Sequence, residues 1–164
     1  LSYGGGTSGF PVDFGEKLII GCLLLKLPPE LAGTLVFHVG KGSRGCAWAS
    51  RYFSEAGLYH QALPFARLAV FNEEDASYGG GLSAVAQYHF VSAMTSGTFE
   101  EVKNHSLRLL QQAPYSPGYL QLVMSRLEGE DIGRFREAIG GVWNMKLLGL
   151  PRSRTYRSEL QRWN

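Results

Sequence analysis

The feature of the sequence that most constrains the fold is a short signature that occurs three times. Each copy has a glycine, an aromatic residue two positions later, and a small or β-branched residue three positions further on. A stretch long enough for a helix lies before and after each glycine, so the signature predicts helical hairpins in series. The copies are Gly57-x-Tyr59-x-x-Ala62, Gly97-x-Phe99-x-x-Val102 and Gly133-x-Phe135-x-x-Ala138.

Each position of the signature has a physical role in a helix–turn–helix unit. Glycine can adopt the left-handed conformation that ends the first helix. The aromatic residue lies in the first turn of the second helix and packs back across the turn. The small residue lets two helix backbones approach closely, and the residues that continue its face of the helix are apolar or small. These faces are Ala62, Ala66 and Ala69; Val102, Ser106, Leu109 and Leu110; and Ala138, Val142 and Met145, with Pro114 and Pro151 ending the last two helices.

The three units resemble tetratricopeptide (TPR) repeats, a family of helical hairpins with a period of about 34 residues. The spacing here is longer, partly because of Gly79-Gly80-Gly81, and Phe90 and Arg126 stand where the family usually has a small residue. The resemblance covers residues 43–151 and implies divergent hairpins. It is carried by Ser50, Phe53, Gly57, Tyr59, Ala62, Ala66 and Ala69 in the first unit, by Ala93, Gly97, Phe99, Leu109 and Pro114 in the second, and by Gly133, Phe135, Ala138 and Pro151 in the third.

The segments outside the repeats complete an all-α prediction. Residues 1–12 are rich in glycine and serine and are expected to form an extended arm. Residues 13–42 are expected to hold a hydrophobic helix, from Asp13 to about Leu27, and a partner segment, Glu30 to Val39. Because Thr34-Leu35-Val36-Phe37 is β-branched and aromatic, a strand is an alternative for this segment. Residues 152–164 read as a basic helix that caps the stack. The predicted fold is a short α-solenoid of about three stacked hairpins with an N-terminal helical segment and this C-terminal capping helix.

A competing pattern is Gly40-Lys41-Gly42-Ser43-Arg44-Gly45, which matches the G-x-G-x-x-G turn of dinucleotide-binding folds. In that interpretation Gly40, Gly42 and Gly45 would let backbone amides hold a pyrophosphate. A second strand with an acidic end should follow, but Leu58 to Val70 has a helical pattern instead. A loop before a helix, with no cofactor, is therefore the preferred interpretation.

Other catalytic and metal-binding patterns are not found in the sequence. It has no G-x-S-x-G or H-E-x-x-H motif, its four histidines are dispersed, and Cys22 and Cys46 have no metal-ligand spacing. We therefore expect a protein that is not an enzyme and binds no metal. Two cysteines favour a reducing compartment, cytoplasmic or an organelle interior such as the mitochondrial one, over secretion. The apolar runs at Leu18–Leu25 and Leu31–Val39 are too short to span a membrane.

The resemblance implies protein binding: a scaffold or adaptor, or a structural subunit of a larger complex. The apolar region 18–39 would suit a subunit interface, and Tyr88, Phe90, Tyr115 and Tyr119 are candidate contacts in the groove that TPR-like stacks use to bind peptides. Net charge is only +2, but the tail keeps an alternative open, an RNA-associated subunit such as a component of an organelle ribosome. Its candidate RNA contacts are Arg152, Arg154, Arg157 and Arg162, helped by Lys41 and Arg44.

Overall fold

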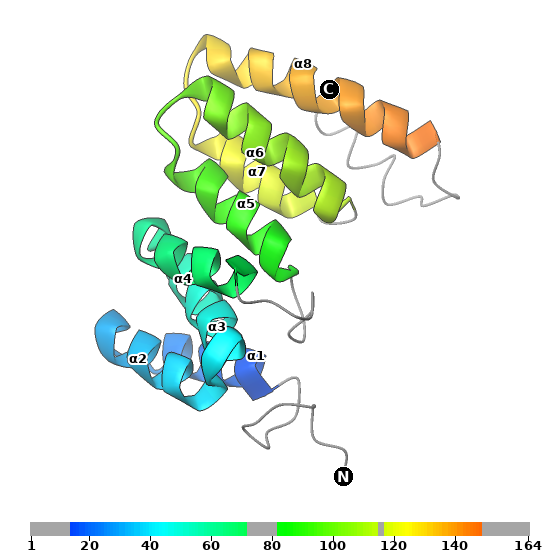
Figure 1. The fold of residues 1–164 in the computed structure, drawn as a ribbon. Coiled ribbons are helices and arrows are strands. Elements are labelled where there is room, and N and C mark those ends of the chain that lie inside the picture. Colours follow the sequence, from blue (N-terminus) through cyan, green and yellow to red (C-terminus); the bar gives the residue numbers. More distant parts are fainter. Residues whose placement is uncertain (1–13, 72–81, 115–116, 149–164) are drawn as a thin grey trace. The chain divides into compact units, whose positions relative to one another are not determined.

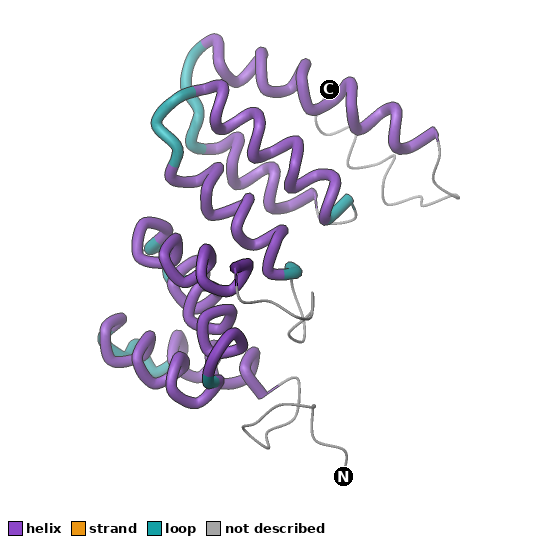
Figure 2. Tube along the Cα trace, in the orientation of Figure 1, coloured by secondary structure: helices purple, strands orange, loops and turns teal. Residues whose placement is uncertain are grey.

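The computed structural model describes residues 14–71, 82–114 and 117–148, the side chains of 117 and 142–148 excepted, and every element in these ranges is an α-helix (Figure 1). Figure 2 shows helices joined by short loops, with no strand in the described ranges, which confirms the all-α prediction. The helices are α1 (Phe14–Leu24), α2 (Pro29–Gly40), α3 (Gly42–Glu55), α4 (Tyr59–Phe71), α5 (Ala84–Thr95), α6 (Phe99–Gln112), α7 (Pro117–Ser125) and α8 (Glu130–Leu148).

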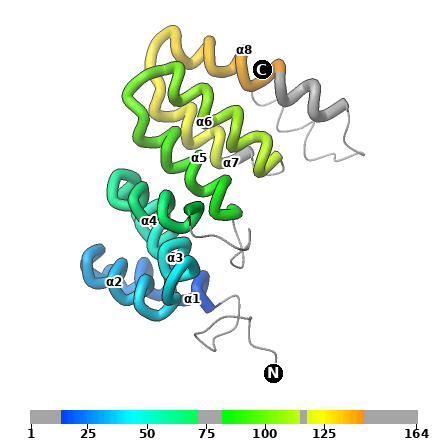
Figure 3. Tube along the Cα trace, in the orientation of Figure 1, coloured from blue at the N-terminus to red at the C-terminus, as the bar shows by residue number. Residues whose placement is uncertain are grey.

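The chain divides into two compact units, Leu1–Val91 and Ser92–Asn164, and the division falls within α5. In the first unit, α3 packs against both α2 and α4, and α1 contacts α2 and α3. In the second unit, α6 packs against α7 and α8 (Figure 3). Within each unit, neighbouring helices are stacked as successive members of a short helical solenoid.

Helix α1 ends in a Schellman motif, in which one residue has the left-handed backbone conformation. Lys26 has a φ of 52°, its N–H donates to the Leu23 carbonyl, and the Leu27 N–H donates to the Cys22 carbonyl. Pro28 follows, and Pro29 opens α2 at a position where its missing N–H costs nothing. The sequence therefore predicted both the end of α1 and the start of α2 to within a few residues.

The strand considered for Thr34 to Phe37 is wrong, because these residues lie inside α2. The Thr34 hydroxyl donates to the Glu30 carbonyl at 2.8 Å, so the β-branched side chain satisfies its polar group within the helix. Val36 is fully buried. Tertiary packing of the apolar face of α2 has overridden the local strand preference.

The loop expected over Gly40 to Gly45 is also wrong. Helix α2 continues to Gly40 and α3 begins at Gly42, so Lys41 alone separates them. The glycines instead allow the two backbones to cross closely. A methyl group on Gly40 would lie 2.7 Å from the Gly45 Cα, and one on Gly45 would overlap the Phe37 carbonyl oxygen.

Aromatic side chains fill the space between α2, α3 and α4. Phe65 lies with its ring centroid 5.8 Å from that of Phe37 and 5.7 Å from that of Phe53, and stacks on the latter. Gly33 lies directly beneath the Phe53 ring, where a methyl group would collide with it. Large rings opposite glycines thus set the spacing of these helices.

The first predicted hairpin is confirmed in its local detail. Gly57 has a φ of 76° and joins α3 to α4. Its N–H donates to the Ser54 carbonyl and the Leu58 N–H donates to the Phe53 carbonyl, which is a second Schellman motif. The predicted small face of α4 is buried: Ala62, Ala66 and Ala69 are all at most 1% exposed.

The start of α6 differs from the prediction at its glycine. Gly97 does not take a positive φ; Thr98 caps the helix, and its hydroxyl accepts the Glu101 N–H at 3.3 Å. Glu100 and Glu101 in the first turn complement the helix dipole. The predicted face of α6 is confirmed, because Val102, Ser106, Leu109 and Leu110 are buried.

The third copy of the signature is shifted relative to the turn. Gly129, with a φ of 58°, lies between α7 and α8, whereas Gly133 is one turn inside α8 and exposed. Phe135 and Ile139 are fully buried, and Ala138 is only partly so. The expectation that Gly133 forms the turn is wrong, because Gly129 supplies the left-handed residue four positions earlier.

Arg126, a large residue where a small one was expected, binds the end of the preceding helical hairpin's first helix, α5. Its guanidinium donates to the Ala93 carbonyl and, at 2.8 Å, to the Ser96 carbonyl, both at the C-terminal end of α5. A cation at this end satisfies carbonyls that lack helical partners and complements the helix dipole.

We expect Arg126→Ala to lower the free energy of unfolding of the second unit by about 1–2 kcal/mol. Arg126→Lys should lose less, because an ammonium keeps the charge but not the planar fork that reaches two carbonyls. Urea unfolding followed by circular dichroism measures both variants. Equal losses for alanine and lysine would show that the guanidinium geometry is unimportant.

Candidate functional site

Large apolar side chains are exposed on α1, α2 and the turn between them. Five of them are more than 40% exposed, and Leu24 and Leu25 reach 76% and 73%. Two pairs are spaced by four residues on their helices, Ile20 with Leu24 and Leu31 with Leu35, so each pair forms a stripe. We call these residues the α1–α2 apolar edge: Ile20, Leu24, Leu25, Leu31 and Leu35.

The charges that accompany the α1–α2 apolar edge are mainly positive. Lys17, Lys26 and Lys41 are exposed on these helices and their turns, against one exposed carboxylate, Glu30. Glu16, the acidic residue of α1, is directed to Arg51 of α3, with a side-chain distance of 3.4 Å. The edge is thus an apolar surface with a cationic border.

A pocket lies in the first unit among α1, α3, α4 and the first half of α5. Its cavity volume is about 30 Å³, which is room for about two water molecules. Four alanines leave the space because their side chains are short. The apolar wall consists of Ile19, Ala47, Trp48, Ala66, Ala69, Leu82 and Ala84.

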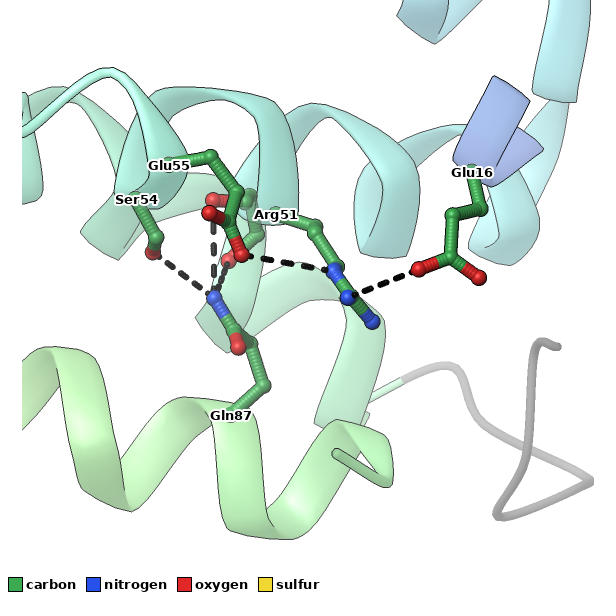
Figure 4. Close-up of polar contacts among 6 residues, drawn as sticks. Glu16, Arg51, Ser54, Glu55 and Gln87 are labelled. Carbon is green, nitrogen blue, oxygen red and sulfur yellow. Dashed lines mark hydrogen bonds and ion pairs between the residues drawn. The ribbon is translucent and has the colours of Figure 1, made fainter. Parts of the chain in front are cut away.

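Polar side chains from three helices form the rim of this pocket, and Figure 4 shows them. Arg51 bridges two carboxylates, with 3.4 Å from its Nη2 to Glu16 Oε1 and 3.8 Å from its Nε to Glu55 Oε1. Gln87 of α5 is 8% exposed, and its Nε2 donates to the Ser54 hydroxyl at 2.8 Å and to the Ser50 hydroxyl at 3.3 Å.

The second unit has a shallow charged groove between α6 and α8. Arg134 lies with its guanidinium carbon 4.1 Å from the centroid of the Phe99 ring, and it also pairs with Asp131 at 3.0 Å. Glu100 accepts from Lys103 at 2.7 Å, and this hydrogen bond lowers the pKa of its carboxyl group. Because these charges pair within the chain, the groove has no clear preference for an ion of either sign.

The aromatic residues predicted to contact a partner differ in how far they are exposed. Phe90 is 3% exposed and packs edge-on against Tyr59 with a centroid distance of 5.8 Å. It is a core residue, so a contact role for it is wrong. Tyr88 and Tyr119 are half-buried, and Tyr115 lies outside the described residues.

The glycine pattern has a packing role. Gly40 ends α2, Gly42 begins α3 and Gly45 is buried against Phe37, so no strand precedes the turn as a dinucleotide site requires. Arg44 lies over the Trp48 ring, 5.7 Å from its centroid. The other basic candidates, Arg152, Arg154, Arg157 and Arg162, lie outside the described residues, as do the arm 1–12 and the capping helix.

Two observations bear on metal and thiol chemistry in the part of the chain that the structure describes. It contains no group of three or more His, Cys, Asp or Glu side chains placed to hold a metal ion. Cys22 and Cys46 are free and buried, and burial raises the pKa of both thiols. A raised pKa keeps a thiol protonated and unreactive.

Sequence reasoning found the apolar edge but missed the pocket. The run from Leu18 to Val39 signalled the edge directly. The pocket joins Glu16 to Gln87 across four helix connections, and its trace in the sequence is the number of alanines on α3, α4 and α5. Among the described helices none is both long and apolar enough to cross a membrane.

Comparison of the chain with protein-family models, with characterised proteins and with solved structures finds no match.

Proposed function

We propose that this chain is a TPR-like interaction module, an adaptor or structural subunit that binds another protein through the α1–α2 apolar edge. The observation that carries the proposal is the exposure of five large apolar side chains on two adjacent helices and the turn between them. Monomeric proteins rarely leave such residues together in water without a partner that covers them. The two buried free thiols fit a reducing compartment.

The partner we propose is an amphipathic helix with acidic residues beside its apolar face. Stripes spaced by four residues on α1 and α2 match the ridges of a third helix packed across them. The exposed Lys17, Lys26 and Lys41 would face the acidic flank. Such rim charges contribute mainly to the choice of partner and to the association rate.

The test is to capture binding proteins with the tagged full chain and with the variant Leu24→Glu/Leu31→Glu. Charges placed on the edge should abolish capture of a stoichiometric partner while leaving the melting temperature nearly unchanged, since both leucines are exposed. Leu122→Glu is the matched control: Leu122 is 47% exposed on α7 of the second unit, and this variant should retain the partner. The captured protein must then bind the purified chain directly, with weaker binding when its acidic flank is neutralised.

Other outcomes would overturn the proposal. A partner kept by the double variant would place binding elsewhere on the chain. Loss of the captured set after nuclease treatment would favour an RNA-associated subunit that uses the Arg152–Arg162 tail. Self-association of the purified chain that the double variant abolishes would identify the occupant as a second copy.

A further inference from the structure

The described glycines of the first unit, with one exception, are explained by the fold. Gly42 and Gly57 have a positive φ. At four others a methyl group would lie less than 3.0 Å from another part of the unit. These crowded glycines are Gly15, Gly33, Gly40 and Gly45. Among the described glycines of the unit, Gly21 alone has neither a positive φ nor a described atom within 4 Å of an added methyl group.

Gly21 lies inside α1 and does not end it. Its carbonyl oxygen accepts the Leu25 N–H at 3.0 Å, and the left-handed residue that ends the helix is Lys26. A glycine inside a helix is less stable than an alanine, because it loses more backbone entropy on folding. Gly21 therefore weakens α1 without serving the packing of the described part of the chain.

Gly21 lies among the residues of the α1–α2 apolar edge. Positions i, i+3, i+4 and i+7 are neighbours on one helix face, and four such positions form the hole that receives one side chain of a packed helix. Ile20 and Leu24 are 47% and 76% exposed, and Lys17 is exposed as well. The space where a side chain would project from Gly21 is open. We call these four residues the Gly21 hole: Lys17, Ile20, Gly21 and Leu24.

We propose that the Gly21 hole receives one large apolar side chain of the partner helix. With glycine at one of its four positions the hole is wider, and the two helix axes can approach toward the lower end of the usual range of about 8–10 Å. The inserted side chain buries apolar area against Ile20 and Leu24, which are otherwise in water. This inference rests on the proposed function, because it names the contact through which the same edge recognises its partner.

The probe is a displayed library of amphipathic helical peptides with acidic flanks, in which the apolar positions are varied. Peptides are selected on the full chain, and those that still bind Leu24→Glu/Leu31→Glu are discarded, because they do not bind the edge. One remaining peptide is synthesised with a fluorescent label. Its affinity for the chain and its variants is then measured by fluorescence anisotropy.

Gly21→Ala should have opposite effects on stability and on binding. The methyl group strengthens α1, so the melting temperature of the free chain should rise by about 2–8 °C. The same methyl group occupies the space of the inserted side chain, so the peptide should bind about 10-fold more weakly. A residue that matters only for the fold would not give this combination.

Gly133→Ala is the matched control. Gly133 lies in α8 of the second unit, and a methyl group there meets nothing within 4 Å. The substitution makes the same chemical change inside a helix, and it should leave the affinity for the peptide unchanged.

A double-mutant cycle identifies the inserted side chain. Each apolar residue of the peptide is replaced in turn by alanine, and affinities are measured for the wild-type chain and for Gly21→Ala. At one peptide position the loss on truncation should be about 10-fold smaller with Gly21→Ala, since the methyl group has already displaced that side chain. At the other positions the two losses should agree.

Two results would overturn the inference: affinity kept or improved by Gly21→Ala, or truncation losses that are independent of Gly21 at every peptide position. Either result leaves the proposed function intact, because binding that Leu24→Glu/Leu31→Glu abolishes still places the partner on the edge. A library that yields no edge-dependent peptide would overturn both.

Discussion

Replacing Gly45 with alanine is expected to destabilise the first unit by about 3 kcal/mol. The added methyl group would overlap the carbonyl oxygen of Phe37 on α2. A backbone atom cannot rotate aside as a flexible side chain can, so α2 and α3 would have to separate. That separation would also loosen the packing between Phe37 and Phe65. Hydrogen exchange of the α2 and α3 amides would measure the loss within the unit.

Gly21→Ala is the matched control for this prediction. Gly21 lies in α1, and a methyl group there would meet nothing within 4 Å. Alanine should therefore stabilise the helix by about 0.5–1 kcal/mol. If both variants behaved alike, the close crossing of α2 and α3 would not be what retains glycine at position 45.

The second large effect is expected at Phe135, where alanine should cost about 3–5 kcal/mol. The ring is fully buried on α8, so its removal leaves a cavity that the surrounding helices can fill only in part. Urea unfolding, together with hydrogen exchange of α6 and α8, would measure the cost. The expected signature is a lower midpoint with little change in the slope.

Phe99 occupies the same position in the repeated signature and provides the comparison. It is half-buried and covered on one face by the Arg134 guanidinium. We expect Phe99→Ala to cost about 1–2 kcal/mol, since only part of its area and one cation–π contact are lost. Similar losses at both positions would contradict the burial difference between them.

The local signals in the sequence predicted the hairpins well where one residue type decides the geometry. Gly57 ends α3 in a Schellman motif, and the spacing of Ala62, Ala66 and Ala69 identified the buried face of α4. The signature misplaced the turn of the third hairpin, where two nearby glycines could each end the helix. Gly129 and Gly133 are four residues apart, and the pattern cannot show which one adopts the left-handed conformation.

Long-range packing accounts for the features that could not be predicted. Thr34 to Phe37 have a strand-like composition, but burial of Val36 against neighbouring helices selects a helix. Phe90 looked like a groove residue because aromatic residues serve both in cores and in interfaces. The pocket depends on which alanines meet across α3, α4 and α5, and residue spacing alone contains no information on that.

The hydrogen bonds of Gln87 have a consequence for how the first unit assembles. The two serines that receive its amide are one helical turn apart on α3, and both are buried. If α5 slid along α3, the amide would lose its two serine acceptors and its donors would be left unpaired out of water, which costs about 1–3 kcal/mol for each unmade bond. Apolar contacts between small side chains tolerate several such alignments. The hydrogen bonds of the amide therefore favour one alignment of α5 on α3 among several that would have nearly the same free energy from hydrophobic burial alone.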